Sequence, residues 1–178
     1  FLIDRLSSDD STATSPDLRI NSLIVRNTSV SYDCEEATTT GGILNPKHLH
    51  ISDISAHVVL KSLTSDSLNL NVKRLSLKEQ SGLRVERLAF RFRGGRHGCL
   101  LQDFHLHTPN SSLSLGTTEA SYVMRGGHLV LPSLRFSGSI GQSVVCPSDF
   151  KSLVPALSSA DEPLRLSATF HGQDEHLD

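Results

Sequence analysis

The sequence has no tryptophan, two tyrosines and three cysteines among its 178 residues. Sugar-binding surfaces usually present exposed tryptophan or tyrosine rings, so this scarcity disfavours a carbohydrate-binding face. The cysteines, Cys34, Cys99 and Cys146, lie far apart and form no CxxC pair, which excludes a disulfide-rich scaffold and the common zinc and redox motifs. No uncharged apolar run approaches the roughly 18 residues of a membrane-spanning helix. The formal net charge is −2, so no overall field attracts nucleic acid or an anionic membrane.

Motifs of catalysis are also missing. The sequence contains no nucleophile elbow, no phosphate-binding glycine loop and no HExxH helix. Its acidic residues lie mostly in predicted turns and inserts, whereas glycosidase chemistry needs two facing carboxylates. We therefore expect a protein without enzymatic activity, catalytic residues, cofactor or bound metal.

What the sequence does contain is a repeated alternation of apolar and polar residues. In the segment LNLNVKRLSL (68–77), leucine or valine occupies every second position until the pair Lys73-Arg74 interrupts the pattern, which then resumes one step out of phase. The segment LRVERLAFRF (83–92) repeats this around Glu86-Arg87. Alternation predicts a strand with one apolar and one solvated face. A two-residue interruption keeps the apolar residues on one face only if the strand bulges or bends there.

The same unit, apolar-x-apolar-x-x-apolar-x-apolar, recurs at 18–25, 49–56 and 129–136. Together with shorter alternating stretches it predicts about a dozen strands in an antiparallel, all-β fold. The glycine pair Gly94-Gly95 is predicted to form a hairpin turn with positive φ angles. The pattern by itself leaves open a sandwich, a barrel or a sheet curled into a groove.

Residues 148–157 break the alternation. Ser148 and the apolar residues that follow it predict the N-cap and apolar stripe of one short helix. Residues 7–17 and 34–46 are predicted loops, and residues 172–178 a polar tail. Because the chain starts at Phe1 within a partial copy of the unit, we expect residues 1–178 to be a single β-rich fragment of a longer repetitive protein.

Two histidine pairs and a group of arginines are the remaining candidate sites. His48 and His50, like His105 and His107, share a strand face as metal ligands do, but each pair lies between apolar positions and is predicted to point to solvent. The arginines between residues 84 and 96 alternate with phenylalanines, so basic and aromatic side chains fall on opposite faces. Single-stranded nucleic acids need both on one surface. We expect neither a metal site nor nucleic acid binding here.

Four segments follow one another along the chain: GILNPKHLHISDISAHVVLKSLTSDSLNLNVKRLSLKEQSGLRVERLAFRF (42–92), HGCLLQDFHLHTPNSSLSLGTTEASY (97–122), LVLPSLRFSGSI (129–140) and SDFKSLVPAL (148–157). In their leucines, small turn residues and order they resemble the repeats of AsmA-like and TamB-like (translocation and assembly module) proteins, in the branch found in Bacteroides-type bacteria. The resemblance covers most of the chain. It implies an elongated sheet curled like a taco shell around an apolar groove.

The resemblance also implies a location and partners. Proteins of this family are long, periplasmic and anchored in the inner membrane, and they are thought to pass phospholipid acyl chains along the groove or to support outer-membrane protein assembly. The implied partners are phospholipid acyl chains and, through parts outside this fragment, an outer-membrane assembly barrel protein. No catalytic residue or cofactor comes with the family.

The inward positions of the alternation are the candidate lipid-groove residues: Leu68, Leu70, Val72, Leu75, Leu77, Leu83, Val85, Leu88, Phe90, Phe92, Leu113, Leu115, Leu129 and Leu131. The same alternation is expected if these residues pack against one another in a closed core. The sequence therefore leaves open both an apolar groove and a closed core. It also leaves open another class of function, a compact β-sandwich module that binds a carbohydrate or protein ligand.

Overall fold

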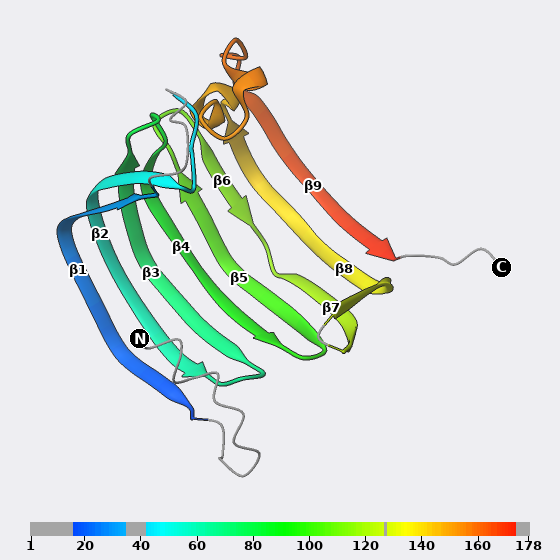
Figure 1. Cartoon of the computed structure of the whole chain (residues 1–178). Helices are drawn as coiled ribbons and strands as arrows, with labels where there is room; N and C mark the ends of the chain where they lie inside the picture. The colour runs from blue at the N-terminus through cyan, green and yellow to red at the C-terminus, as the bar shows by residue number, and fades with distance from the viewer. Residues whose placement is uncertain (1–15, 35–41, 127, 174–178) are drawn as a thin grey trace.

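The computed structural model describes residues 16–34, 42–126 and 128–173. These residues form one nine-stranded antiparallel sheet (Figure 1). The strands are β1 (Leu18–Asp33), β2 (His48–Leu63), β3 (Leu68–Glu79), β4 (Arg84–Gly95), β5 (Gly98–His107), β6 (Ser112–Leu115), β7 (Thr118–Arg125), β8 (His128–Val145) and β9 (Leu164–Gln173). Two short 3₁₀ helices, η1 (Pro147–Phe150) and η2 (Pro155–Leu157), connect β8 to β9. The predicted antiparallel, all-β fold is confirmed, with fewer and longer strands than expected.

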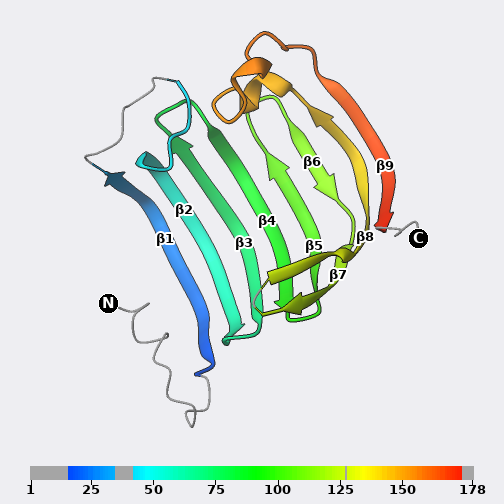
Figure 2. The same ribbon diagram turned by 45° about the vertical axis from the view of Figure 1, so that its right-hand side comes forward.

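The sheet is a meander that runs from edge strand β1 to edge strand β9. The strands lie in the order β1-β2-β3-β4-β5-β6-β8-β7, β9 pairs with β8, and β5 also pairs with β7. β6 and β7 lie end to end between β5 and β8, because β5 pairs with β6 over 104–107 and with β7 over 98–101. Within the described residues, β1 pairs only with β2 and β9 only with β8. The result is a single curved layer with two free edges (Figure 2).

The two-residue interruptions are β-bulges, as predicted. Val72 pairs with Phe90 and Leu75 with Leu88, so β3 carries one residue more than β4 at Lys73-Arg74. Further register shifts fall at the other interruptions, including Ser52/Ser55 in β2 and Leu75/Leu77 against β4. Each bulge restores the phase of the alternation, which keeps the apolar residues on one face.

Three of the bulges contain a residue in the left-handed region. Asn27 has φ 46°, Asp53 has φ 54° and Asp103 has φ 52°. Each lies at a register shift of its strand with a neighbour. Asparagine and aspartate tolerate this conformation better than other non-glycine residues because their short polar side chains can bond locally.

Cross-strand pairing defines the two faces, since direct partners project to the same side of a sheet. Apolar partners form continuous rows: Ile20, Leu60, Leu70, Phe92 and Leu101 in one, Leu23, Val58, Val72 and Phe90 in a second, and Val25, Ala56, Leu75, Leu88, Leu106 and Leu113 in a third. We call this side the apolar face. The other side, the polar face, carries pairs such as His57 with Arg74 and Asn71 with Arg91.

No second layer covers the apolar face in the part of the chain that the structure describes. Among the described residues the buried apolar side chains are Val72, on this face, and Cys146, at the N-cap of η1, each 6% exposed, whereas Tyr32 and Leu131 are 55% and 65% exposed. A closed core and a two-sheet sandwich are therefore both wrong for these residues. The curled single sheet is the architecture that the resemblance implied.

The short helix predicted at 148–157 is wrong in type. The segment forms η1 and η2, and Cys146 rather than Ser148 occupies the N-cap of η1, without a side-chain capping bond. Proline explains the break, because it lacks an amide hydrogen and disfavours helical angles in the residue before it. Val154, which precedes Pro155, is extended with φ −132° and ψ 94°.

Other boundaries also differ from the predictions. Gly94 and Gly95 are not the turn: they pair with Cys99 and Gly98, and neither has a positive φ, so the turn residues are 96–97. The tail predicted from Gly172 starts later, because β9 continues to Gln173. Residues 16–17 and 42–47 lack strand structure apart from one isolated bridge at Asn45, in line with the predicted loops. Residues 7–15, 35–41 and 174–178 of the predicted loops and tail lie outside the described residues.

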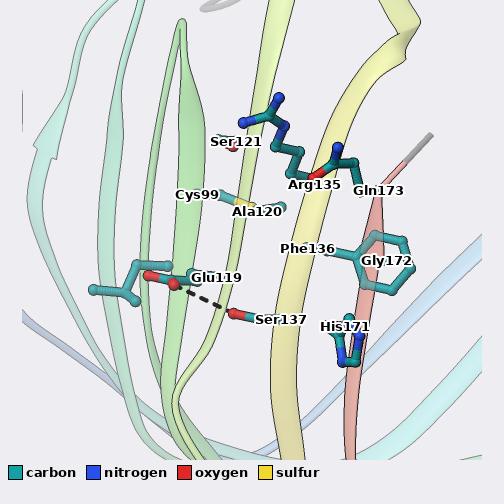
Figure 3. Close-up of a pocket in the computed structure, with 11 residues that line it drawn as sticks. Cys99, Glu119, Ala120, Ser121, Arg135, Phe136, Ser137, His171, Gly172 and Gln173 are labelled. Atoms are coloured by element: carbon teal, nitrogen blue, oxygen red, sulfur yellow. Dashed lines mark hydrogen bonds between the residues drawn. The ribbon is translucent and has the colours of Figure 1, made fainter. Parts of the chain in front are cut away.

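Aromatic rings cover glycines where β8 meets β9. Phe136 pairs with Gly172, and Gly138 pairs with Phe170. The two Phe-x-Gly sequences therefore lie side by side and antiparallel, with each phenylalanine opposite the other sequence's glycine. The two ring centroids lie 6.4 Å apart. Figure 3 shows the Phe136 ring beside Gly172. A ring that lies over a cross-strand glycine fills the space that a side chain would occupy and shields the exposed backbone.

These contacts predict that Gly138→Ala and Gly172→Ala destabilise the sheet. A Cβ atom on Gly138 would lie 2.6 Å from Cζ of Phe170, and one on Gly172 would overlap the Phe136 ring. We expect each change to lower the free energy of unfolding by about 1–3 kcal/mol, as overpacking does, in urea titrations followed by circular dichroism.

Gly95→Ala is the matched control, because its Cβ would come no closer than 3.8 Å to the Asp66 carbonyl oxygen. It should be neutral or slightly stabilising. Equal destabilisation by Gly95→Ala and Gly172→Ala would show that contact with the phenylalanine rings is not what makes alanine unfavourable at these positions.

Candidate functional site

The structure brings most of the predicted groove residues together on the apolar face. The predicted residues in β3, β4 and β6 are Leu68, Leu70, Val72, Leu75, Leu77, Val85, Leu88, Phe90, Phe92, Leu113 and Leu115. They pair with one another or with apolar residues of β5, except that Leu68 pairs with Gly94. Phe90 also stacks on Phe104, with ring centroids 6.4 Å apart. Together they form a continuous aliphatic and aromatic surface across the middle of the sheet.

Three predicted residues lie at the margins of this surface. Leu83 precedes β4 in a turn, where its carbonyl oxygen accepts a hydrogen bond from the Glu79 amide. Leu129 pairs with Met124 of β7 near the sheet end. Leu131 lies in the long bulge of β8 at Pro132 and is 65% exposed, so Leu134 rather than Leu131 reaches the hollow described next.

The apolar face is hollowed at the end of the sheet where β3 and β5 begin. A depression of about 790 Å³ is lined by Ser65, Asp66, Gly95, Arg96, Cys99, Ala120, Tyr122, Met124, Leu129 and Leu134. Ser65 and Asp66 come from the β2–β3 turn, whereas Leu129 and Leu134 come from β8 on the far side of β4, β5 and β7. Residues so far apart in the sheet can line one depression only if the sheet curves around it, so the apolar face is the concave one here.

The opposite end of the sheet is bridged. The Leu44 amide donates a hydrogen bond of 2.8 Å to the Ser152 carbonyl oxygen, which joins the loop before β2 to the segment after η1. In the sheet β3, β4, β5 and β6 separate β2 from β8, a span of roughly 24 Å in a flat sheet at the usual strand spacing. The bond therefore crosses the curve of the sheet, and both segments lie at the upper end in Figure 1.

Asp149 fixes η1 to the β5–β6 turn beneath this bridge. Its carboxylate accepts hydrogen bonds from the Thr108 hydroxyl, from the Ser111 hydroxyl at 2.7 Å, and from the amide and side chain of Asn110 at 3.0 and 2.8 Å. Burial raises the pKa of Asp149, but the donors from Thr108, Ser111 and Asn110 together outweigh it and hold the pKa below its usual value.

The histidine pairs lie on the polar face, as predicted. His48 and His50 pair with Asp33 and Ser31, and the Asp33 carboxylate lies 3.1 Å from Nδ1 of His48 and 3.2 Å from Nε2 of His50. The hydrogen bond from His48 lowers the pKa of Asp33, and the charge of His50 adds to this. The His48 side chain is only 13% exposed, so it points less fully to solvent than predicted. His105 and His107 are exposed.

The arginines and phenylalanines of β4 lie on opposite faces of the sheet. Phe90 and Phe92 pair with Val72 and Leu70, while Arg91 and Arg93 pair with asparagines on the polar face, so basic and aromatic side chains are separated as predicted. Within the described ranges, no group of three or more histidine, cysteine or acidic side chains is arranged to hold a metal ion. Cys34, Cys99 and Cys146 are free thiols.

No protein-family model, curated protein or solved structure matches this chain. The resemblance to AsmA-like and TamB-like proteins therefore rests on the repeat pattern alone. Among the residues that the structure describes, no helix is long and apolar enough to cross a membrane.

Sequence reasoning missed three features of the apolar face and its ends. These are the hollow, the bridge from Leu44 to Ser152, and the covering of glycines by phenylalanine rings. Only the last had a local signal, since Phe-x-Gly occurs at 92–94, 136–138 and 170–172. The hollow and the bridge join residues from opposite sides of the sheet, and no local pattern reports such distances.

The Asp149 contacts predict a pH-dependent stability. Because the folded-state pKa lies below the unfolded value of about 3.9, this carboxylate stabilises the fold above that value and loses the effect as the pH falls through the folded-state pKa. At neutral pH, Asp149→Asn should lower the free energy of unfolding by roughly 1.5–3 kcal/mol, the range for hydrogen bonds to a charged group.

Urea titrations at pH 7, 5 and 3 would measure both effects, with Glu162→Gln, an exposed acid in the same connection, as control. The difference between wild type and Asp149→Asn should shrink as the pH falls, while Glu162→Gln should follow wild type throughout. A difference that stays constant from pH 7 to pH 3 would contradict the role of the charged form.

Proposed function

We propose that the apolar face is a groove for phospholipid acyl chains, in a non-enzymatic section of an AsmA/TamB-like periplasmic protein. The observation that carries the proposal is the apolar face itself, which has no covering layer in the described residues although rows of leucine, valine and phenylalanine cross it. Soluble proteins rarely expose contiguous apolar surface of this kind unless it binds something.

The lining suits an acyl chain. Each CH₂ group moved from water to an apolar surface contributes about 0.8 kcal/mol, and the rows on β2, β3 and β4 offer that surface continuously. Aliphatic side chains present no fixed donors or acceptors, so a chain can occupy many positions along them. The alternative of a β-sandwich module lacks its second sheet in the described part of the chain.

The resemblance gives this groove its proposed setting. The full protein would be anchored in the inner membrane and contribute to lipid transport or outer-membrane biogenesis, with an outer-membrane assembly barrel protein as a partner of other parts of the chain. The bridge lies at one end of the proposed groove and the hollow at the other.

Lipid extraction tests the proposal directly. The chain purified without detergent and extracted with organic solvent should release phospholipid, detected by mass spectrometry, because an uncovered apolar face holds acyl chains through purification. A photo-crosslinking residue at Leu70 or Phe90 should form lipid adducts in cells, whereas one at Asn71 on the polar face should not.

Asn71 is the matched control because it is adjacent to Leu70 in β3 and pairs with Arg91 on the other face. Extracts without phospholipid, together with equal labelling from Leu70 and Asn71, would refute the groove.

A further inference from the structure

The hollow at the end of the apolar face where β3 and β5 begin combines an apolar floor with one pair of opposite charges. Ala120, Met124, Leu129 and Leu134 line it, and Asp66 and Arg96 are the charged residues among its lining. Nη2 of Arg96 lies 2.7 Å from Oδ1 of Asp66, and the two side chains are 67% and 45% exposed. A volume of about 790 Å³ falls within the range of small-molecule sites.

Both charges project from ordered turns. The turn that carries Asp66 is held by Thr64, whose amide donates to the Ser67 carbonyl oxygen at 2.9 Å and whose hydroxyl accepts from the Ser67 amide at 3.0 Å. Arg96 lies in the two-residue turn between β4 and β5. There the Tyr122 hydroxyl donates a hydrogen bond of 2.8 Å to the Gly95 carbonyl oxygen, and the Tyr122 amide donates one of 3.0 Å to the His97 carbonyl oxygen. The two turns that carry the charges are thus held beside an apolar surface.

The charge pattern selects the ligand. An exposed ion pair contributes little to folding, so a ligand that offers better partners can separate it. Arginine binds phosphate oxygens through two parallel hydrogen bonds, and a carboxylate binds an ammonium group. A headgroup with both phosphate and ammonium satisfies Arg96 and Asp66 together, whereas a headgroup with phosphate alone leaves Asp66 as a repulsive neighbour.

We infer that this hollow is a headgroup site for zwitterionic phospholipids, with the phosphate on Arg96, the ammonium on Asp66, and the acyl chains on the apolar floor. The inference rests on the proposed groove and adds to it a ligand class and a place of entry. Tyr122 is a positioning residue here, because its hydroxyl holds the turn that carries Arg96.

Calorimetric titration of the whole chain with water-soluble short-chain phospholipids tests the site. The probes are phosphatidylcholine and phosphatidylglycerol with identical acyl chains. We expect wild type to bind phosphatidylcholine roughly three- to fivefold more tightly, the size that one exposed ion pair contributes. Asp66→Asn should remove or reverse this preference, and Arg96→Gln should weaken the binding of both lipids.

Asp53→Asn is the matched control. Asp53 forms an ion pair of 2.6 Å with Lys78, at similar exposure but away from the hollow, and asparagine tolerates its positive φ. This variant should keep the wild-type preference, and urea titrations would show whether the variants stay folded. Loss of preference in Asp53→Asn as well would overturn the assignment to Asp66.

The outcomes separate the two proposals. If neither lipid binds to wild type, the groove is refuted. If both lipids bind equally, or if the preference survives both Asp66→Asn and Arg96→Gln, the groove stands and the headgroup site is wrong.

Discussion

Everything in this structure depends on cross-strand pairing within one layer. A sandwich or barrel stabilises its strands by packing against a second layer or by closure, but the described strands form one sheet, in which each strand pairs with its neighbours. Direct apolar partners such as Val72 with Phe90 therefore provide the packing that a core would provide elsewhere. The same constraint leaves the apolar face without a covering layer in the part of the chain that the structure describes.

The bulges make this arrangement possible. If the chain passed through Lys73-Arg74 as a regular strand without a bulge, Leu75 and Leu77 would turn to the polar face and interrupt the apolar rows. Bulges also bend a strand and increase its twist, and they recur in β1, β2, β3, β4, β5 and β8. Curvature and a continuous apolar face thus follow from one local device, repeated across the sheet.

The two ends of the curved sheet differ in chemistry. At the bridged end, Asp149 gathers donors from the β5–β6 turn, and the backbone bond from Leu44 to Ser152 crosses the curve. At the hollow end, Asp66 and Arg96 border apolar residues of β7 and β8. The proposed ligand, an elongated lipid with one polar end, would place that end at the hollow and its acyl chains along the apolar face.

Local pattern determined the antiparallel all-β fold, the bulges at the two-residue interruptions and the faces of β3 and β4, because period-two alternation is a property of the extended backbone itself. The sequence misjudged the segment 148–157, where proline overrides an apolar spacing typical of a helix, and the turn after Gly95, where two other residues reverse the chain. The first error arises where backbone sterics at proline outweigh side-chain periodicity.

By itself, then, the sequence determined an antiparallel sheet with Leu70 and Phe92 on one face and Asn71 and Arg91 on the other. Only the tertiary structure decided that nothing in the described residues covers the apolar face, that one end is bridged, and that Asp66 meets Arg96 beside the hollow. The physical reason is the separation along the sequence of the residues that specify each feature. Alternation is encoded between residues two apart, whereas curvature sums small bends over many strands and brings together residues that share no local pattern.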